Sequence, residues 1–187
     1  IDAEDDSDLD EGGSPDRPVY AIYTSGSTGR PKGALLYHRG ANNLLHWYTR
    51  EFGMGPSTTF LMIASISFDL QQKSVFAPLL VGGRLVIPDS PAFDPAQFRG
   101  LIAEHGVTHL NCAPSAFYAL IEGADETAWR QLAGLTQVFL GGELIHKPRL
   151  RPWLRQRWCK AQVINSYGPT EATVVTIAVR VAVCVLA

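Results

Sequence analysis

The sequence of 187 residues predicts an α/β fold in which helices flank a mostly parallel β-sheet. Short apolar runs alternate with segments of helical periodicity along most of the chain, which is the pattern of successive βαβ units. Polar segments with glycine follow directly after several of these runs, where open parallel sheets bind their ligands. A hydrophobic content of 46% and a charged content of 18% are typical of a globular domain with a sizeable core.

The first half of the chain contains three strand candidates and two helix candidates. The strand candidates are short apolar runs, and the helix candidates repeat apolar residues at spacings of three and four. In order, the expected elements are a strand over 19–23, a helix over 41–52, a strand over 60–63, a helix over 70–80 and a strand over 85–87. Gly82 and Gly83 are expected to end the second helix.

The second half begins with the helix whose boundaries are most clearly marked. Asp94 can cap its N-terminus, Pro95 suits its first position and Gly106 can close it. The expected elements that follow are a strand over 107–112, a helix over 115–121, a strand over 137–140, a helix over 150–158 and a strand over 163–165. Strands and helices therefore continue to alternate, as a largely parallel sheet requires.

Charge is distributed unevenly along the chain. Residues 1–18 hold eight acids and are rich in Gly, Ser and Pro, so we expect an acidic lead-in or linker ahead of one domain over 19–187. Residues 17–187 carry ten acids against 16 bases, and this basic excess suits an anionic ligand. The excess also fits the solvated face of a single helix, because it includes Arg149, Arg151, Arg155 and Arg157.

Several functional classes find no support in the sequence. The three cysteines lie far apart without a CxxC pair, which argues against a zinc site and fits a reducing, cytoplasmic compartment. The apolar stretch over 172–187 is interrupted by Arg180 and is shorter than the roughly 20 residues of a membrane span. The start is acidic, unlike a signal peptide. No basic stripe with interleaved aromatic residues points to nucleic acid.

A loop over 24–33 directly follows the first strand candidate. Its glycines let the backbone approach a ligand, and its hydroxyls and free amides can donate to phosphate oxygens, while Lys32 supplies a positive charge. A flexible surface loop would have a similar composition. A P-loop NTPase is disfavoured, because Pro31 precedes the lysine and Gly33 takes the place of the required Ser or Thr.

The order of residues in this loop carries a family resemblance. The string Y-T-S-G-S-T-G-R-P-K-G over 23–33 closely resembles the phosphate-binding signature of the adenylate-forming superfamily. Members include acyl-CoA synthetases, luciferases and the adenylation domains of nonribosomal peptide synthetases. The resemblance implies a fragment of the large N-terminal domain of such an enzyme, with Lys32 as a catalytic residue. The residues implied to bind ATP in this loop are Thr24, Ser25, Gly26, Ser27, Thr28, Gly29 and Lys32.

A second motif, N-S-Y-G-P-T-E over 165–171, also follows a strand candidate. Tyr167 can stack on a base, Thr170 can donate to a phosphate and Glu171 can bind Mg²⁺. A Gly-Pro turn whose tyrosine packs on the core is the structural alternative. By resemblance to the family's Y-G-P-T-E element, Asn165 and Tyr167 contact adenine with Gly168 beside them, Thr170 contacts the α-phosphate, and Glu171 holds the metal. Thr170 and Glu171 are accordingly also catalytic candidates.

Two further motifs complete the implied site. Gly141 and Gly142, in L-G-G-E over 140–143, resemble the floor of the adenine and substrate pocket, although a small-residue turn into a helix would look the same. Phe68 and Asp69 resemble an F-D pair of peptide-synthetase adenylation domains, in which the Asp pairs with the substrate α-ammonium. Taken alone, a carboxylate such as Asp69 at the start of an apolar helix usually indicates an N-cap.

The resemblance also implies a pocket for the amino-acid side chain. Besides Phe68 and Asp69, its expected residues are Leu70, Lys73, Asn111, Phe139, Gly141, Ser166, Val174 and Val175. Lys73 and Asn111 favour a polar or acidic substrate side chain, although Lys73 also suits a solvated helix face.

The implied activity is ATP- and Mg²⁺-dependent activation of an amino acid as aminoacyl-AMP, which then loads the phosphopantetheine arm of a carrier domain. Carrier and condensation domains are the implied partners. The resemblance covers only part of an adenylation domain, since the ribose-binding aspartate and the C-terminal lid domain have no counterpart in this sequence. Two alternatives remain open: a fragment of an acyl-CoA or aryl-acid ligase, and a catalytically inactive nucleotide-binding fragment.

Overall fold

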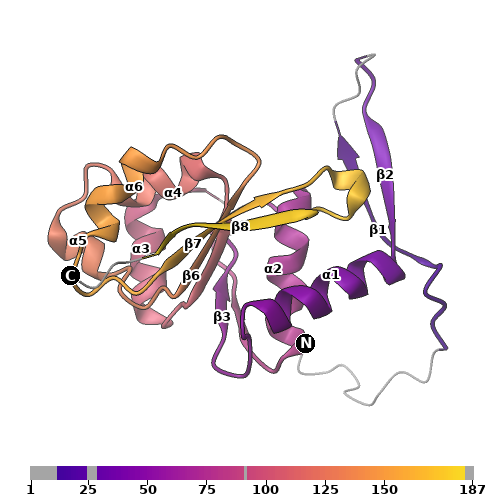
Figure 1. Ribbon diagram of the computed structural model, residues 1–187, viewed down its shortest axis with the longest axis horizontal. Coiled ribbons are helices and arrows are strands. Elements are labelled where there is room, and N and C mark those ends of the chain that lie inside the picture. The colour runs from indigo at the N-terminus through magenta and orange to yellow at the C-terminus, as the bar shows by residue number, and fades with distance from the viewer. Residues whose placement is uncertain (1–11, 25–28, 91, 184–187) are drawn as a thin grey trace.

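A computed structural model describes residues 12–24, 29–90 and 92–183. Its main feature is a six-stranded sheet in the order β4-β3-β5-β6-β7-β8, with every neighbouring pair parallel except the antiparallel pair β7–β8 (Figure 1). The strands are β3 (Thr59–Leu61), β4 (Arg84–Val86), β5 (His109–Cys112), β6 (Gln137–Gly141), β7 (Gln162–Tyr167) and β8 (Ile177–Val183). The mostly parallel α/β sheet expected from the sequence is confirmed.

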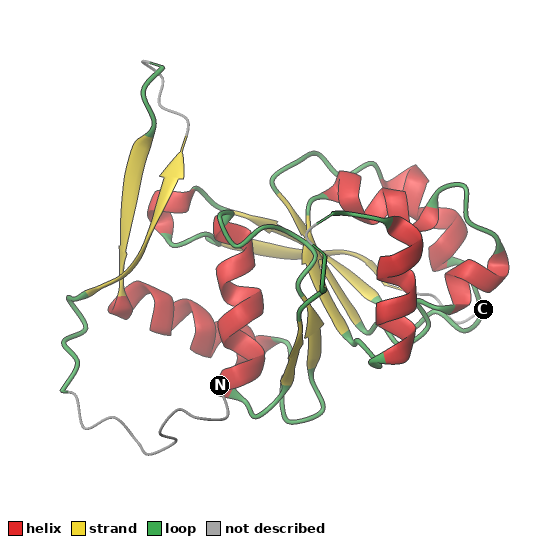
Figure 2. Cartoon of the chain, turned by 180° about the vertical axis from the view of Figure 1, so that it is seen from behind, coloured by secondary structure: helices red, strands yellow, loops and turns green. Residues whose placement is uncertain are grey.

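A separate antiparallel hairpin lies at one end of the molecule and consists of β1 (Pro18–Thr24) and β2 (Lys32–Tyr37) (Figures 1 and 2). The sequence predicted its first strand but treated Lys32 and Gly33 as loop, and in the structure both belong to β2. The strand β8 was also missed, because its residues were interpreted only as an apolar tail. Within β8, buried and exposed positions do not separate into a clear core-facing row, with Ile177 and Val179 both more than half exposed.

Helices cover both faces of the main sheet. They are α1 (His38–Glu51), α2 (Asp69–Leu80), α3 (Pro95–Glu104), α4 (Pro114–Ile121), α5 (Glu126–Arg130) and α6 (Lys147–Leu154), with a 3₁₀ turn η1 at Thr170–Ala172. Two predictions need correction: the short α5 was not anticipated, and α6 ends at Leu154 instead of reaching Trp158. The predicted start of α3 is confirmed, because the Asp94 side chain accepts a hydrogen bond from the Ala96 amide at 3.0 Å.

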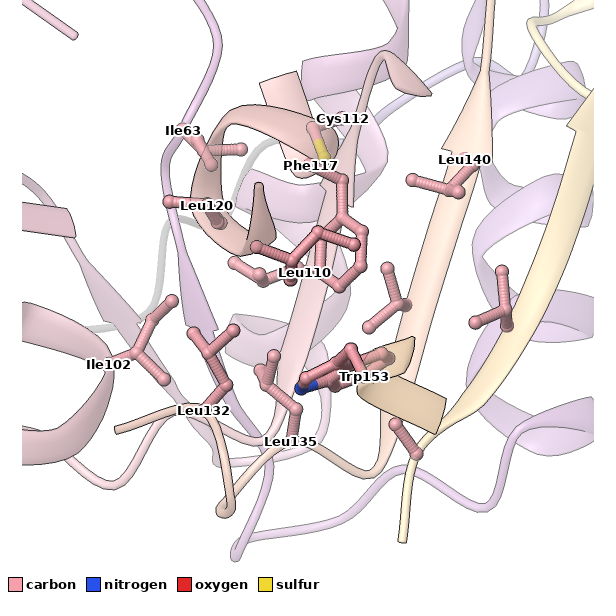
Figure 3. Packing of buried hydrophobic residues seen from close by; sticks show 14 of the residues in the cluster. Ile63, Ile102, Leu110, Cys112, Phe117, Leu120, Leu132, Leu135, Leu140 and Trp153 are labelled. Atoms are coloured by element: carbon pink, nitrogen blue, oxygen red, sulfur yellow. The ribbon is translucent and has the colours of Figure 1, made fainter. Parts of the chain in front are cut away.

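The larger core lies between the sheet and α3, α4 and α6. Leu110 and Cys112 point into this core from β5, and Phe117 and Trp153 meet there edge to face, with ring centroids 5.1 Å apart (Figure 3). All four side chains are at most 1% exposed. Because side chains alternate along a strand, the residues between them face the opposite side of the sheet.

The smaller core lies on that opposite side, beneath α1 and α2. Tyr48 and Phe52 of α1 pack on Phe139 of β6, with centroid separations of 4.8 and 4.7 Å. His109 of β5 lies between Phe60 and Phe139 on the same face. Burial of the imidazole lowers the pKa of His109 to about 4, so this histidine is neutral and aromatic at physiological pH.

Candidate functional site

The carboxyl ends of β6 and β7 and the start of α2 enclose a pocket of about 580 Å³. This is the edge of a parallel sheet at which ligands usually bind. Predicted site residues that line the pocket are Asp69, Leu70, Gly142, Asn165, Ser166, Tyr167, Gly168, Thr170 and Val174. The structure therefore brings together residues from three motifs that lie up to 101 positions apart.

Asp69 is the first residue of α2, and its carboxylate has donors on both oxygens. Oδ1 accepts from the backbone amide of Leu70 at 2.6 Å, and Oδ2 accepts from the hydroxyl of Thr170. The N-cap position itself belongs to Phe68, which makes no side-chain cap. The alternative of a simple N-cap therefore does not describe Asp69, because its long-range contact reaches across the pocket to the turn after β7.

Gly141 allows the three walls of the pocket to come together. A Cβ at this position would lie 2.7 Å from the carbonyl oxygen of Ser166 and 3.3 Å from Cδ2 of Leu70. Such contacts are too close for a methyl group, so any larger residue would push β6 away from β7 or from α2. Gly141 itself contributes no lining to the pocket, and its role in the structure is close packing.

The segment after Gly142 adds pocket residues that the sequence motifs did not identify. Leu144 and Ile145 both line the pocket, and Leu144 is 76% exposed. Their only sequence signal is their position just beyond a strand of a parallel sheet. Glu143 anchors this segment, because its carboxylate accepts from the amide and the hydroxyl of Ser115 at 3.0 and 2.9 Å.

Lys73 lies one helical turn beyond Asp69 and is 1% exposed, which excludes the solvated-helix alternative. Its ammonium has no hydrogen-bond partner among the described residues and lies 5.9 Å from the centroid of the Tyr48 ring. Burial lowers the pKa of Lys73 to about 7, and the negative charge of Asp69 partly opposes that shift. Lys73 does not line this pocket and instead borders a small separate cavity together with Tyr20 and residues of α1.

Asn111 and Phe139 are also buried behind the pocket. The Asn111 amide donates to the Leu70 carbonyl and, at 2.8 Å, to the hydroxyl of Ser74, while its own oxygen is unpartnered within the described structure. Phe139 is fully buried in the core beneath α1. Phe68, by contrast, points outward with 63% exposure.

The turn that follows β7 has an unusual backbone. Thr173 and Val174 adopt φ angles of 60° and 70°, in the left-handed region that β-branched residues rarely enter. Each such residue costs on the order of 1–2 kcal/mol. Val174 is nevertheless buried at 2% exposure and lines the pocket. Strain of this kind is common at functional sites.

Only some of the predicted phosphate-binding residues belong to the part of the chain that the structure describes. Ser25, Gly26, Ser27 and Thr28 lie outside the described residues. Thr24, Gly29 and Lys32 are described, but none of them lines the pocket. The strand β2 packs against η1, so the hairpin lies beside the Y-G-P-T-E turn (Figure 1). Glu171, within η1, is exposed to solvent.

The described residues form neither a metal site nor a membrane span. In the parts of the chain that are described, no group of three His, Cys, Asp or Glu side chains could hold a metal ion. No described helix has the length and apolar character needed to cross a bilayer.

Comparison with known proteins identifies the family. Residues 2–184 match the family described as AMP-binding enzyme. The chain is 39% identical over 171 residues to tyrocidine synthase 3 of Brevibacillus parabrevis, covering 91% of this chain and 3% of that protein. It is 40% identical over 168 residues to a dimodular nonribosomal peptide synthase of Bacillus subtilis (strain 168), covering 86% of this chain and 7% of that protein.

Solved structures of nonribosomal peptide synthetase proteins are also similar to this chain. The nonribosomal peptide synthetase FmoA3, in its α-methyl-L-serine-AMP bound form, matches with a TM-score of 0.79 and 30% identity over 91% of this chain and 19% of that one. PA1221, a protein containing adenylation and PCP domains, matches with a TM-score of 0.77 and 30% identity over 94% of this chain and 34% of that one. The chain thus spans only a small part of these relatives. It belongs to the AMP-binding enzyme family, as a partial adenylation domain of the nonribosomal peptide synthetase type.

Proposed function

We propose that this chain is the part of an adenylation domain that binds an amino acid and ATP, so that the amino-acid carboxylate is activated as aminoacyl-AMP. The observation that carries the proposal is that Asp69 shares one pocket with Asn165, Tyr167 and Thr170. A carboxylate suited to an ammonium group therefore lies beside residues suited to a nucleotide. In this proposal residues 19–187 belong to the adenylation domain and residues 1–18 form its lead-in.

Asp69 would bind the α-ammonium of the substrate. Its carboxylate is half-buried at the pocket wall and fixed by the Leu70 amide, so it presents a positioned negative charge. A charge-assisted hydrogen bond to an ammonium is stronger than a neutral one. Fatty and aryl acids carry no such group, and this difference favours an amino-acid substrate over the acids used by acyl-CoA or aryl-acid ligases.

The nucleotide would bind along the carboxyl end of β7. Tyr167 is 67% exposed and offers a ring face to adenine, with Asn165, Gly168 and Gly142 lining the pocket beside it. Thr170 would donate its hydroxyl to the α-phosphate. Residues 24–32 would approach the β- and γ-phosphates from the neighbouring hairpin. The similar protein FmoA3 has an α-methyl-L-serine-AMP bound form and an AMPPNP-bound form, which supports nucleotide binding by this chain.

Glu171 and Lys32 would act on the charge of the phosphates. The exposed carboxylate of Glu171 fits the usual Mg²⁺ arrangement of one or two carboxylates completed by phosphate oxygens and water. ATP supplies the electrophilic α-phosphorus and the pyrophosphate leaving group. The contribution of this chain is to hold the reacting groups in line and to neutralise developing charge, and both effects can be large.

The substrate side chain would extend toward Lys73 and Asn111. Asn111 donates its amide to the Leu70 carbonyl, and Lys73 and Asn111 each have a buried polar atom without a described partner. A carboxylate would accept from the Lys73 ammonium, and a side-chain amide could in addition donate to the Asn111 oxygen. Aspartate, glutamate, glutamine and leucine should therefore be compared as ligands, and a clear preference for leucine would contradict this part of the proposal.

The product would pass to the phosphopantetheine arm of a carrier domain within a cytoplasmic synthetase. Proteins of the matched type include PA1221, in which adenylation and PCP domains occur together. Carrier and condensation domains are accordingly the proposed partners.

Calorimetry on this chain tests the proposal directly. The twenty proteinogenic L-amino acids are titrated singly, and ATP is titrated with Mg²⁺. We expect at least one amino acid to bind, and Asp69→Asn to weaken that binding roughly 10- to 100-fold because a charged hydrogen bond is lost. The exposed Asp89→Asn provides the matched control.

Other outcomes identify the alternatives. Binding of fatty or aryl acids without any amino acid would favour the acyl-CoA or aryl-acid ligase. Binding of ATP with no amino-acid-dependent exchange of pyrophosphate would favour the inactive nucleotide-binding fragment.

A further inference from the structure

The two partners of the Asp69 carboxylate differ in kind. The Leu70 amide belongs to the backbone of α2 and stays with Asp69 as long as the helix is intact. The Thr170 hydroxyl comes from the turn after β7, 101 residues away, and can leave by a movement of that turn or a side-chain rotation. The removable partner lies on the pocket side, where the substrate ammonium would approach.

Thr170 cannot serve two acceptors at once. A threonine hydroxyl has a single hydrogen to donate, and in the structure that hydrogen is donated to Asp69. In the proposed function the same hydrogen is needed by the α-phosphate of ATP. Donation to phosphate therefore requires release from Asp69, and that release leaves Oδ2 of Asp69 without a protein donor.

The turn that carries Thr170 packs closely against the pocket wall and against α1. Thr173 and Val174 hold the left-handed conformation that closes the turn, and Val174 is buried at 2% exposure in the pocket wall. On the other side, Thr173 packs against Gly40 of α1. A Cβ at Gly40 would lie 2.7 Å from Oγ1 of Thr173, so the turn and α1 are already in close contact.

We propose that Thr170 gates Asp69: its hydroxyl occupies the ammonium-binding carboxylate until a phosphate acceptor draws it away. This inference rests on the proposed function and adds a coupling between its two ligands. An amino acid and MgATP each favour the state in which Thr170 has left Asp69, so each strengthens the binding of the other.

The proposal predicts that removing the Thr170 hydroxyl increases the affinity for the amino acid. In Thr170→Val the shape is kept and the donor is lost, so an amino acid found in the panel above should bind roughly three- to tenfold more tightly in the absence of ATP, as expected for one competing hydrogen bond. A purely structural role for Thr170 would leave the affinity unchanged or reduce it. Thr170→Ser restores the donor and should return the affinity toward that of the wild type.

Two further variants sharpen the test. Gly40→Ala keeps threonine at position 170 but displaces the turn that carries its hydroxyl away from Asp69, and it should also tighten amino-acid binding. Thr176→Val is the matched control, because its hydroxyl bonds the Tyr167 carbonyl at 3.2 Å and makes no recorded contact with Asp69. Saturating MgATP should tighten amino-acid binding to the wild type at least severalfold and have a smaller effect on Thr170→Val.

The outcomes separate the gate from the function on which it rests. If the wild type binds an amino acid and Thr170→Val binds it equally or more weakly, the gate is wrong and the proposed function stands. If no amino acid binds the wild type or any of the variants, the proposed function fails and the gate fails with it.

Discussion

The environment of a single side chain in this fold does not follow from its neighbours in the sequence. Lys73 follows Asp69 by four positions on a helix, a spacing that usually places two side chains on one face. The structure buries that face beneath α1, so the lysine loses its hydration and gains only the distant charge of Asp69 and the ring of Tyr48. Asp69, at the same helix end, remains open to the pocket.

The lowered pKa of Lys73 predicts how stability depends on pH. Between a folded value of about 7 and the ordinary value of 10.5, the unfolded chain binds more protons than the folded one, so the free energy of unfolding rises with pH. The penalty for burying the charge is complete below about pH 7 and disappears toward pH 10.5. Lys73→Met should therefore stabilise the protein at pH 7 and flatten the rise.

Urea unfolding at pH 7 and pH 9.5 measures this effect. The exposed Lys160→Met serves as the control, because a lysine in water should leave the pH dependence as it is. A steeper rise with pH in Lys73→Met than in the wild type would refute the explanation.

At the scale of elements, the contacts between loops and helix ends hold the pocket together. The loop after β6 is fixed to the start of α4 by Glu143, whose carboxylate takes both donors of Ser115. A carboxylate near a helix N-terminus also interacts favourably with the helix dipole. The sequence could place Glu143 after a strand but could not show which helix it would meet.

Removing this contact should loosen one wall of the pocket. We expect Glu143→Ala to lower the free energy of unfolding by about 1 kcal/mol, since two exposed hydrogen bonds contribute modestly. Amide hydrogen exchange at His146, whose amide donates to the Tyr118 hydroxyl at 2.7 Å, should accelerate more than exchange in β6. In a double-mutant cycle with Ser115→Ala the two losses should be less than additive, and full additivity would show that the contact does not form in solution.

The N-cap of α3, unlike the Glu143–Ser115 contact, was predicted from the sequence. Asp94→Ala should lower the free energy of unfolding by about 1 kcal/mol, because the Ala96 amide loses its acceptor. Chemical denaturation would measure the loss, with the exposed Asp89→Ala as control. A neutral effect of Asp94→Ala would indicate that water replaces the cap without cost.

At the scale of the whole molecule, one sheet joins two cores that lie on its opposite faces. Leu110 and Val138 belong to the core beneath α4 and α6, while Phe139 and Ile164 belong to the core beneath α1. Neighbouring residues of the same strands thus face both cores. Neither core can be lost without disturbing the strands that support the other.

This arrangement predicts cooperative unfolding of both cores. Trp153→Ala removes the largest fully buried side chain of the structure and should cost about 3–5 kcal/mol. With Trp129 and Trp158 replaced by Phe in both proteins, circular dichroism and the fluorescence of Trp47, which packs against the opposite core, should still report one shared transition at lower denaturant. Leu79→Ala, at a 58% exposed position, should have little effect. Two separate transitions in Trp153→Ala would show that the cores unfold independently.

The sequence by itself determined the alternating elements, the start of α3 and the motifs of the candidate site, because these depend on local periodicity, capping and residue order. It did not predict β2 or β8, since each forms only by pairing with another strand, and it extended α6 past its end at Leu154. Tertiary structure alone decided that Asp69 meets Thr170, that Lys73 is buried and that Phe68 points outward. Those outcomes depend on how elements pack across the sheet, and a contact spanning 101 residues leaves no trace in local sequence.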